Sequence, residues 1–250
     1  MLALKNSHVR DKDITFQEEG HLYTIRGNTY YKSCTTWVKS FFEKFNPDDI
    51  IEKMMASDKW KDNKYFGMTK KEIKTLWTEN GKIASGFGTS MHKHIEEFYN
   101  GKDLPEELPI ELSYFKMFYI DHPELVPFRT EMMIYDEDIL ICGSVDMLFM
   151  NEDGTLSIYD WKFSKEIQTH SYGKKGIGPA SSMNDCNTTH YSLQLNLYRE
   201  ILERKYGFVI KDMVLVFMHR SLCESYAKYP VSHIDMKPFL ETRFKKNILN

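Results

Sequence analysis

The chain has 250 residues, of which 42% are hydrophobic and 28% are charged, and its formal net charge is −3. This length suits one large domain, or one domain with a helical elaboration, and the composition is that of a soluble globular chain. The charge lacks the basic excess that many nucleic-acid-binding proteins carry, although a local basic groove would be enough for binding. Because the chain has no membrane-length apolar run and is charged too early for a signal peptide, we expect an intracellular protein, in the cytoplasm or nucleus, without a membrane partner.

Cysteine usage agrees with that expectation. The four cysteines are Cys34, Cys142, Cys186 and Cys223, and no two of them form a C-x-x-C pair. We therefore expect four reduced thiols rather than a disulfide framework.

The N-terminal segments predict a small hairpin followed by helices. The stretch TIRGNTYY carries a Gly-Asn turn between aromatic-rich runs, which is typical of a β-hairpin. We expect a helix that Thr35 or Thr36 caps and that continues to Phe45. A second helix should begin with Asn46 as its cap and Pro47 at its first position.

Three further helices are expected before the pattern changes. The first is capped by Thr69 and ends near Gly81, and the next covers IASGFGTSMHKHIEEFY and ends at Gly101. The last covers LPIELSYFKMFYID and ends before Pro123.

The second half of the chain predicts a sheet with a helical crossover. Three strands are expected, in VPFRTEMMIYDED, ILICGSVDMLFM and TLSIYDWKF, and the NEDG turn between the last two lacks the spaced ligands of a calcium loop. A long loop from about Ser164 to Asn187 then leads to the helix TTHYSLQLNLYREILERKYG, the strand MVLVFMHR and a terminal helix. The sequence thus predicts an α/β fold of order αβββαβ, with an N-terminal elaboration at 1–83 and the core at 84–250.

The third strand ends on charged residues. Asp160 and Lys162 take the side of the strand that Leu156 and Ile158 begin, because side chains two apart face the same way. A surface ion pair would explain this, and such pairs are common and weak. A metal ligand beside a cation that stabilises an anion is the alternative interpretation.

Similar polar residues occur on three other elements. They are His92 and Glu96, four apart on one helix face, Asp146 at the end of GSVD, and Gln194 and Tyr198, four apart on the later helix. Each has an ordinary explanation as a surface, turn or packing residue. Together they would let two carboxylates from adjacent strands converge on one cation, for which oxygen ligands favour Mg²⁺ and a histidine shifts the preference toward Mn²⁺. Zinc remains possible, but the H-E-x-x-H and paired-cysteine spacings are absent.

The motifs G-T-x-x-H-x-x-x-E, G-x-V-D, D-x-K and Q-x-x-x-Y occur in that order between Gly88 and Tyr198. This order resembles the RecB-like branch of the PD-(D/E)XK nuclease superfamily. Relatives by this pattern include CRISPR-associated adaptation nucleases, the mitochondrial genome-maintenance exonuclease, and phage and viral exonucleases. The resemblance implies a PD-(D/E)XK restriction-endonuclease-like core with a mixed sheet, which agrees with the αβββαβ order.

The resemblance also implies roles for individual residues. His92, Asp146, Asp160 and the backbone carbonyl of Trp161 would hold Mg²⁺ or Mn²⁺, and Lys162 would be the catalytic lysine. Glu131, on the preceding strand, would support a second metal or the substrate, and Glu96 would lie behind the ligands. Gln194 and Tyr198 would orient the lysine or contact the DNA backbone.

The sequence departs from some RecB-like nucleases in its cysteines. Those relatives hold an iron–sulfur cluster with one cysteine before the core and a close trio after it. Here Cys34 precedes the core, Cys186 lies in the long loop, and only Cys223 follows Tyr198. We therefore expect no iron–sulfur cluster.

We expect a metal-dependent deoxyribonuclease that acts as an exonuclease on DNA ends or single strands in DNA repair, recombination or replication. A structure-specific or site-specific endonuclease, an inactive DNA-binding relative, and a zinc or iron enzyme of other chemistry are the alternatives. DNA would be held by Lys174 and Lys175, in a loop that Gly173, Gly176 and Gly178 make flexible. Tyr172 could stack on unpaired bases.

Overall fold

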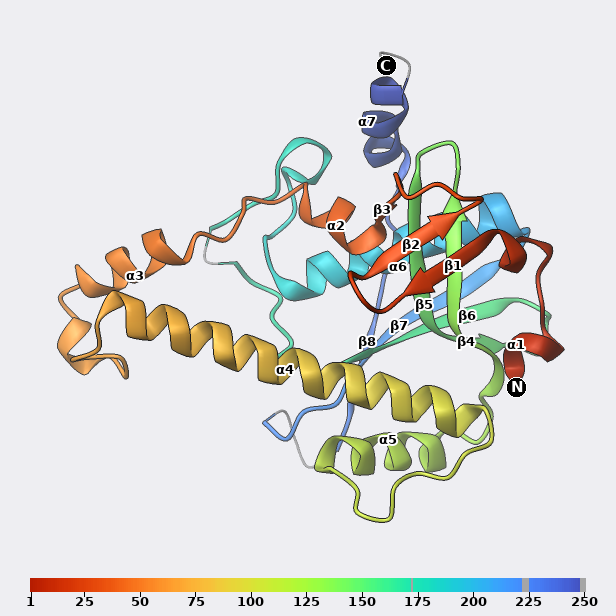
Figure 1. Ribbon diagram of the computed structural model, residues 1–250, viewed down its shortest axis with the longest axis horizontal. Coiled ribbons are helices and arrows are strands. Elements are labelled where there is room, and N and C mark those ends of the chain that lie inside the picture. The colour runs from red at the N-terminus through yellow and green to blue at the C-terminus, as the bar shows by residue number, and fades with distance from the viewer. Residues whose placement is uncertain (172, 222–224, 248–250) are drawn as a thin grey trace.

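The computed structural model describes residues 1–171, 173–221 and 225–247, and it has a mixed β-sheet with helices on both faces (Figure 1). The fold is therefore of the α/β class. Within the described ranges, no helix combines the length and the apolar character that crossing a membrane requires.

Seven α-helices and three short 3-10 turns are present in the described ranges. The α-helices are α1 (Leu2–Lys5), α2 (Cys34–Lys39), α3 (Pro47–Met55), α4 (Lys70–Tyr99), α5 (Ile110–Asp121), α6 (Asn187–Tyr206) and α7 (Lys237–Asn247). The 3-10 turns are η1 (Val9–Asp13), η2 (Trp60–Asp62) and η3 (Gly178–Ala180).

The strands form a two-stranded hairpin and a larger six-stranded sheet. The hairpin consists of β1 (Ile14–Gln17) and β2 (Leu22–Ile25). The larger sheet consists of β3 (Lys32–Ser33), β4 (Val126–Asp136), β5 (Ile141–Met150), β6 (Leu156–Lys162), β7 (Ile210–Phe217) and β8 (Ala227–Pro230).

Strand β5 lies at the centre of the larger sheet and changes partner along its length. It pairs with β4 along one side, whereas on the other it pairs with β3 near its start and with β6 near its end. The last β5–β6 pair is Met147 with Tyr159, and beyond it β6 continues beside β7 alone, in parallel. The two strands therefore separate at Asp146 and Asp160 and leave a fork in the sheet.

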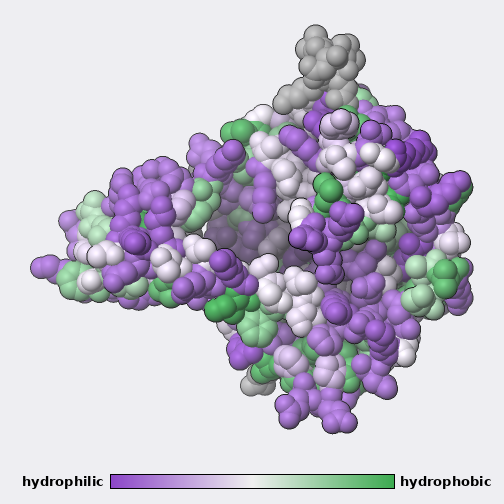
Figure 2. Space-filling model, viewed as in Figure 1, coloured by the Kyte–Doolittle hydropathy of each residue, from purple (hydrophilic) through white to green (hydrophobic). Residues whose placement is uncertain are grey.

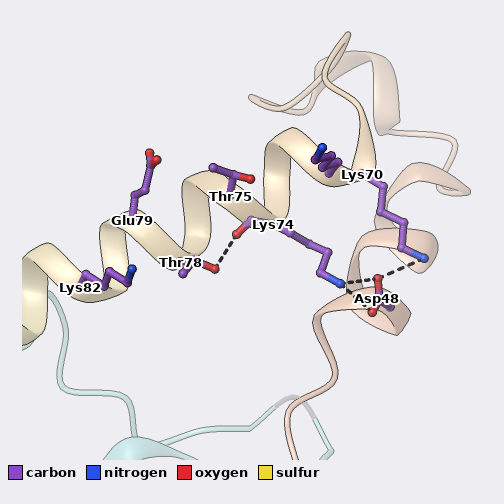
Figure 3. Close-up of a pocket in the computed structure, with 8 residues that line it drawn as sticks. Asp48, Lys70, Lys74, Thr75, Thr78, Glu79 and Lys82 are labelled. Atoms are coloured by element: carbon purple, nitrogen blue, oxygen red, sulfur yellow. Dashed lines mark hydrogen bonds and ion pairs between the residues drawn. The ribbon is translucent and has the colours of Figure 1, made fainter.

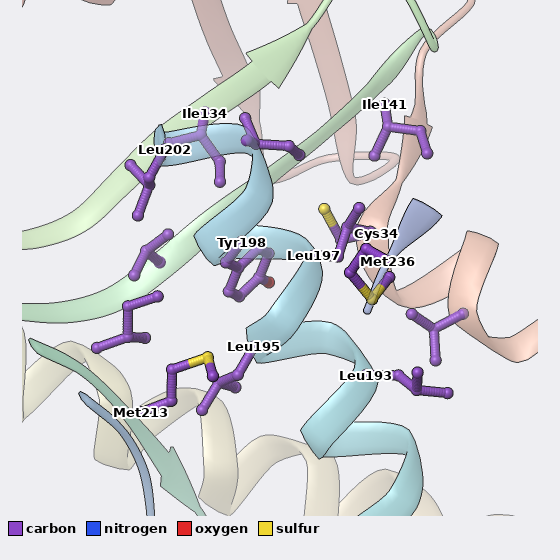
Figure 4. Close-up of a cluster of buried hydrophobic side chains, with 14 of the residues drawn as sticks. Cys34, Ile134, Ile141, Leu193, Leu195, Leu197, Tyr198, Leu202, Met213 and Met236 are labelled. Carbon is purple, nitrogen blue, oxygen red and sulfur yellow. The ribbon is translucent and has the colours of Figure 1, made fainter. Parts of the chain in front are cut away.

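Two apolar cores lie on opposite faces of the sheet. One is formed with α2, α6 and α7, and α6 runs along it with Tyr198 and Leu202 directed inward (Figure 4). The other is formed with α4 and α5, where Phe115, Phe118 and Trp161 pack together. The two helical layers thus hold the fork between them.

Helix α4 is 30 residues long and joins the core to a projecting arm (Figure 1). Its C-terminal half packs on the core through Met91 and Ile95, while Ile73, like Ile51 of α3, is buried in the arm. The residues from 78 to 87 between these ends are all exposed. Figure 2 shows a hollow between the arm and the body of the molecule.

Most predicted elements are confirmed, including the Asn46 cap with Pro47, the Thr69 cap, α5, the three consecutive strands, α6, β7 and the terminal helix. The predicted hairpin position is wrong. The turn that joins β1 and β2 lies at residues 18–21, and the Gly-Asn turn instead closes on itself through Ile25 and Asn28. The chain after it pairs with β5, because tertiary contact rather than local turn chemistry selects its partner.

Two helix boundaries also differ from the prediction. Ser33 caps α2, accepting a hydrogen bond from the Thr36 amide, and the helix ends at Lys39 rather than Phe45. The two helices expected on either side of Gly81 are one helix, since a helix tolerates an isolated glycine at a cost of about 1 kcal/mol. The boundary placed between residues 83 and 84 consequently falls within α4.

Candidate active site

Helix α4 carries His92 to the fork in the sheet. The imidazole Nε2 lies 2.9 Å from the carbonyl oxygen of Trp161, and Nδ1 lies 3.5 Å from carboxylate oxygens of both Glu131 and Asp146. One histidine therefore joins α4 to three strands. If Nε2 donates to the carbonyl, Nδ1 faces the two carboxylates, and it becomes available as a metal ligand once its proton is lost.

Asp146 marks the point where β5 and β6 separate. Its Oδ2 accepts a hydrogen bond of 2.9 Å from the amide of Trp161. This bond satisfies a backbone amide just beyond the last β5–β6 pair, where the ladder has ended. The aspartate of the G-x-V-D motif thus accepts the hydrogen bond of a β6 amide that has no backbone partner on β5.

Glu131 has an unusual backbone for a residue within a strand. Its φ is +43°, a left-handed conformation that costs a non-glycine residue about 1–2 kcal/mol. It lies between the pairs that Thr130 and Met132 make with β5 and is thus opposite Asp146. Its Oε2 accepts a hydrogen bond of 2.8 Å from Ser144 Oγ. The strained backbone and this bond together fix the carboxylate beside His92.

Asp160 and Lys162 form an ion pair at the end of β6. The Asp160 carboxylate is only 1% exposed, and its Oδ1 has no hydrogen-bond partner among the described residues. The Lys162 Nζ lies 4.7 Å from the centre of the Tyr191 ring on α6, close enough for a cation–π contact. The interpretation as an exposed surface pair is therefore wrong, because the pair is enclosed by the helix that packs on the sheet.

The pKa values of the charged groups at the fork are shifted because these groups are buried close to one another. Burial and the nearby Asp146 raise the pKa of Asp160 to about 6, despite the opposing effect of Lys162. Burial also raises the pKa of Asp146, against the effect of His92. Burial disfavours the charged form of His92, but Asp146 and Glu131 outweigh it and raise its pKa to about 9. The group therefore holds a surplus of carboxylates that an added cation would stabilise.

Three side chains are grouped closely enough to bind one metal ion. Ligand atoms of His92, Glu131 and Asp146 lie within 4.8 Å of one another. Asp160, predicted as a ligand, is paired with Lys162 and lies outside this group, and the Trp161 carbonyl contacts His92. Glu131, predicted in a supporting role, is thus a member of the group.

The remaining predicted site residues lie at different depths. Burial and Glu131 raise the pKa of Glu96, which agrees with a position behind the group. Gln194 is half-buried and donates a hydrogen bond of 2.6 Å to the Tyr198 hydroxyl. Tyr198 itself is only 3% exposed and belongs to the apolar core, so its predicted contact with DNA is not supported.

The burial of Tyr198 explains the glycine of the G-x-V-D motif. A Cβ at Gly143 would lie 2.9 Å from a ring carbon of Tyr198 and 3.1 Å from Cys34 Sγ. Figure 4 shows Tyr198 and Cys34 directed into the same cluster. Cys34, Cys142 and Cys186 are free thiols buried in the structure, and Cys223 lies outside the described residues.

The loop before α6 is less open than predicted. Lys174 and Lys175 are exposed, but Lys175 Nζ donates to Asn184 Oδ1 at 2.9 Å. Gly176 is buried, and a Cβ there would lie 2.6 Å from Ala180, so this glycine allows close packing rather than flexibility. Tyr172 lies outside the described residues.

A hollow of about 710 Å³ lies on the arm, away from the group formed by His92, Glu131 and Asp146. In Figure 3, Lys70 and Lys74 both reach Asp48 of α3, so their charges are paired. Lys82, at the near end of this hollow, precedes His92 by ten residues, or about 15 Å along a helix. The fork, rather than this hollow, is therefore the candidate active site.

The sequence offered little signal for two of the site's contacts. Tyr191 contacts Lys162 from α6, but an aromatic residue three positions before Gln194 reads as ordinary helix packing. Ser144 fixes Glu131 across two strands, and only the strand register brings these residues together. Ser144 is paired with Met133 and is the diagonal neighbour of Glu131, so pairing residues directly across the strands does not reveal this contact either.

No protein-family model and no curated protein matches this chain. Among solved structures, one described as the crystal structure of SSO0001 is similar, with a TM-score of 0.40 and 14% sequence identity. The match covers 89% of this chain and 78% of that chain. A likeness this weak identifies neither a family nor a function.

Proposed function

We propose that this chain is a metal-dependent deoxyribonuclease of the RecB-like branch of the PD-(D/E)XK superfamily. The observation that carries the proposal is the meeting of His92, Glu131 and Asp146 beside the buried Asp160–Lys162 pair. The order α4, β4, β5, β6, α6, β7, with α5 inserted between α4 and β4, also supports it, because it agrees with the αβββαβ core of that superfamily. Both features depend on residues far apart in the sequence.

The donor set fits Mg²⁺ or Mn²⁺. Glu131 and Asp146 offer oxygen atoms, and His92 offers a nitrogen that shifts the preference toward Mn²⁺. The buried Asp160 Oδ1, which has no hydrogen-bond partner in the described ranges, is a further acceptor beside the group. A bound divalent ion would supply Lewis acidity, which activates water and stabilises charge on the reacting phosphate.

Lys162 is the best candidate for the stabilising cation. Asp160 and Asp146 raise its pKa against the effect of burial, so it stays protonated at neutral pH. Asp160 and the Tyr191 ring hold the ammonium in one position. A fixed charge of this kind stabilises the transition state without reorganising, or orients the attacking water.

The favoured mode is exonucleolytic, and digestion of end-labelled DNA with Mn²⁺ or Mg²⁺ tests it. We expect linear duplex or single-stranded DNA to give mononucleotides or short oligomers, circular DNA to stay intact, and EDTA to abolish the reaction. A double variant, Asp160→Asn with Lys162→Met, is the inactive control, because it removes both charges of the pair together. Cleavage of circular DNA would favour an endonuclease, and binding without cleavage would indicate an inactive relative.

Metal analysis separates this proposal from unrelated metal chemistry. Purified protein should need added Mn²⁺ or Mg²⁺ for cleavage and should not retain stoichiometric zinc or iron. Tightly held zinc or iron that survives EDTA and accompanies no DNA cleavage would replace the nuclease proposal with a zinc or iron enzyme.

A further inference from the structure

A small cavity lies between α2 and the first turns of α6. Its volume is about 200 Å³. The residues that line it are Thr35, Val38, Lys39, Asn187, His190, Tyr191 and Gln194. Pockets for whole drug-sized ligands measure roughly 300–1,000 Å³, so this cavity suits a single flat ring system.

Tyr191 connects this cavity to the proposed reaction site. Its ring lines the cavity, and the same ring is contacted by Lys162 Nζ at 4.7 Å. A group in the cavity would thus lie one aromatic ring away from the cation that we assign to the scissile phosphate. In a nucleic acid, the group at that distance from a phosphate is the sugar or base of an adjoining nucleotide.

The charge of the lining suits a nucleotide. No lining residue is acidic, and within the described part of the chain the exposed Lys39 has no ion-pair partner. The other titratable lining group, His190, is hydrogen-bonded to Asp185 at 2.9 Å, its ring lies tilted against Phe42, and burial lowers its pKa. Lys39 is therefore the cation free to contact a phosphate at the rim.

The remaining lining groups suit a base. Val38 supplies an apolar surface, Tyr191 supplies a ring, and Gln194 uses its Nε2 on Tyr198. Its Oε1 makes no hydrogen bond with the described residues and can accept one from a base edge. Asn187 is less suited, because its amide already bonds to Gln168, Ser164 and Glu166.

We infer that this cavity is a subsite for one unpaired nucleobase, next to the phosphate that is cleaved. The inference rests on the proposed nuclease function and narrows its substrate class to single-stranded or frayed DNA. A paired base cannot enter, because a base pair is larger than the single ring system that a cavity of about 200 Å³ holds. Base stacking of this kind tolerates all sequences, as an exonuclease requires.

The test fills the cavity from its exposed side. Thr35 lines the cavity but is exposed, so Thr35→Trp can occupy the space without disturbing the core, and Thr36→Trp on the same helix, outside the lining, is the matched control. The substrates are single-stranded thymidine oligonucleotides, either intact or with one abasic nucleotide at a defined position. Thermal melting of each variant confirms that the fold is kept.

For wild-type protein and Thr36→Trp, an abasic nucleotide should lower kcat/KM at the adjoining bond by about 10-fold, the scale of one lost base stack. Thr35→Trp should cut intact DNA about 10-fold more slowly than wild type, and its cleavage should no longer depend on the abasic site. Cleavage by wild-type protein that ignores the abasic site at every position would overturn the subsite and leave the nuclease proposal standing.

Binding separates failure of the subsite from failure of the function. Fluorescence anisotropy in Ca²⁺ compares intact oligonucleotides with fully abasic ones of equal length. If no DNA is cut, yet Thr35→Trp weakens binding of the intact strand alone, the subsite holds and the nuclease proposal fails. If neither cleavage nor binding depends on the bases, the subsite is rejected.

Discussion

Glu131 shows how a single residue stores strain at this site. Its positive φ lies within the longest strand, where an ordinary residue would remain extended. The strain is offset by the contacts of its carboxylate with Ser144 and His92. Strain at a ligand-binding position is typical of sites in which geometry is maintained at the expense of stability.

Replacing Glu131 should therefore separate stability from metal binding. Glu131→Gly relieves the left-handed backbone and should leave the free energy of unfolding unchanged or raise it by up to about 1 kcal/mol. Glu131→Gln keeps the strain and should not be stabilised. Both variants should bind Mn²⁺ about 10-fold or more weakly in calorimetric titrations. A Gly variant clearly less stable than the Gln variant would show that the backbone is not strained.

The Asp160–Lys162 pair allows a second separation of roles. Asp160→Asn leaves a buried ammonium without its partner and should destabilise the fold by about 3 kcal/mol, besides abolishing cleavage. Adding Lys162→Met should recover most of that stability but none of the activity. Chemical denaturation and DNA digestion of the two single variants and the double variant measure this. Additive losses of stability would mean that the pair is not coupled.

At the scale of elements, α6 and β5 approach closely at one glycine. The space that Gly143 leaves open is filled by Tyr198 and Cys34, so the motif glycine and the motif tyrosine are parts of one packing contact. The tyrosine hydroxyl in turn holds Gln194 beside the α2–α6 cavity. The motif thus preserves the distance between the helix and the sheet.

Gly143→Ala should shift that distance. The added methyl group meets the Tyr198 ring at 2.9 Å, so we expect a loss of about 1–3 kcal/mol in the free energy of unfolding. Gly88→Ala is the matched control, because its Cβ would meet only Phe163 at 3.9 Å within a helix. That control should be neutral or stabilised by up to about 1 kcal/mol. Equal melting temperatures for both variants would contradict the packing role of Gly143.

At the scale of the whole molecule, the N-terminal segment is bound to the end of β4 through Arg10. Arg10 pairs with Glu137 at 2.6 Å, and its guanidinium lies 3.9 Å from the centre of the Tyr135 ring. The hydrogen bond from Arg10 lowers the pKa of Glu137 from its ordinary value of 4.5 to about 2. The segment that precedes β1 is therefore held to the β4–β5 turn by a charge contact.

This contact should make stability depend on acid pH. Because the folded pKa of Glu137 is lowered, its contribution is complete above about pH 4.5 and is lost as the pH falls toward 2. Glu137→Gln should cost about 1 kcal/mol at pH 7, a value discounted because the side chain is 36% exposed. Urea unfolding of both proteins at pH 7 and near pH 2 measures the difference. If the two proteins still differ in free energy of unfolding near pH 2, the difference does not come from the Arg10–Glu137 ion pair.

A chain of net charge −3 needs a local group of basic residues to bind DNA, and the loop before α6 is the candidate. Lys174 is exposed on the loop before α6, whereas Lys175 is bonded to Asn184 and to the Ser182 carbonyl. Lys174→Ala should weaken DNA binding and reduce its salt slope by about 1, as one phosphate contact would. Lys175→Ala should affect the slope less. Wild-type affinity and slope in Lys174→Ala would exclude this loop from the binding surface.

The sequence by itself determined the types of most elements and named most of the residues that meet at the fork. Helix caps such as Asn46 and Thr69, and alternation in the strands, act over a few residues, so they are visible without the fold. Spacing alone grouped His92 with Glu96 and Asp160 with Lys162, since i and i+4 share a helix face and i and i+2 share a strand face. Glu131 was named only from the resemblance to RecB-like nucleases.

The tertiary structure alone decided which of these residues meet and how deeply they lie. The two-residue strand β3 carries no pattern of its own and forms because β5 offers it an edge. Three features of the site depend on how elements distant in sequence pack or pair. They are the position of the Glu131 carboxylate, the burial of Tyr198 and the contact of Tyr191 with Lys162. Such contacts are selected by the total free energy of packing, which no local window of sequence contains.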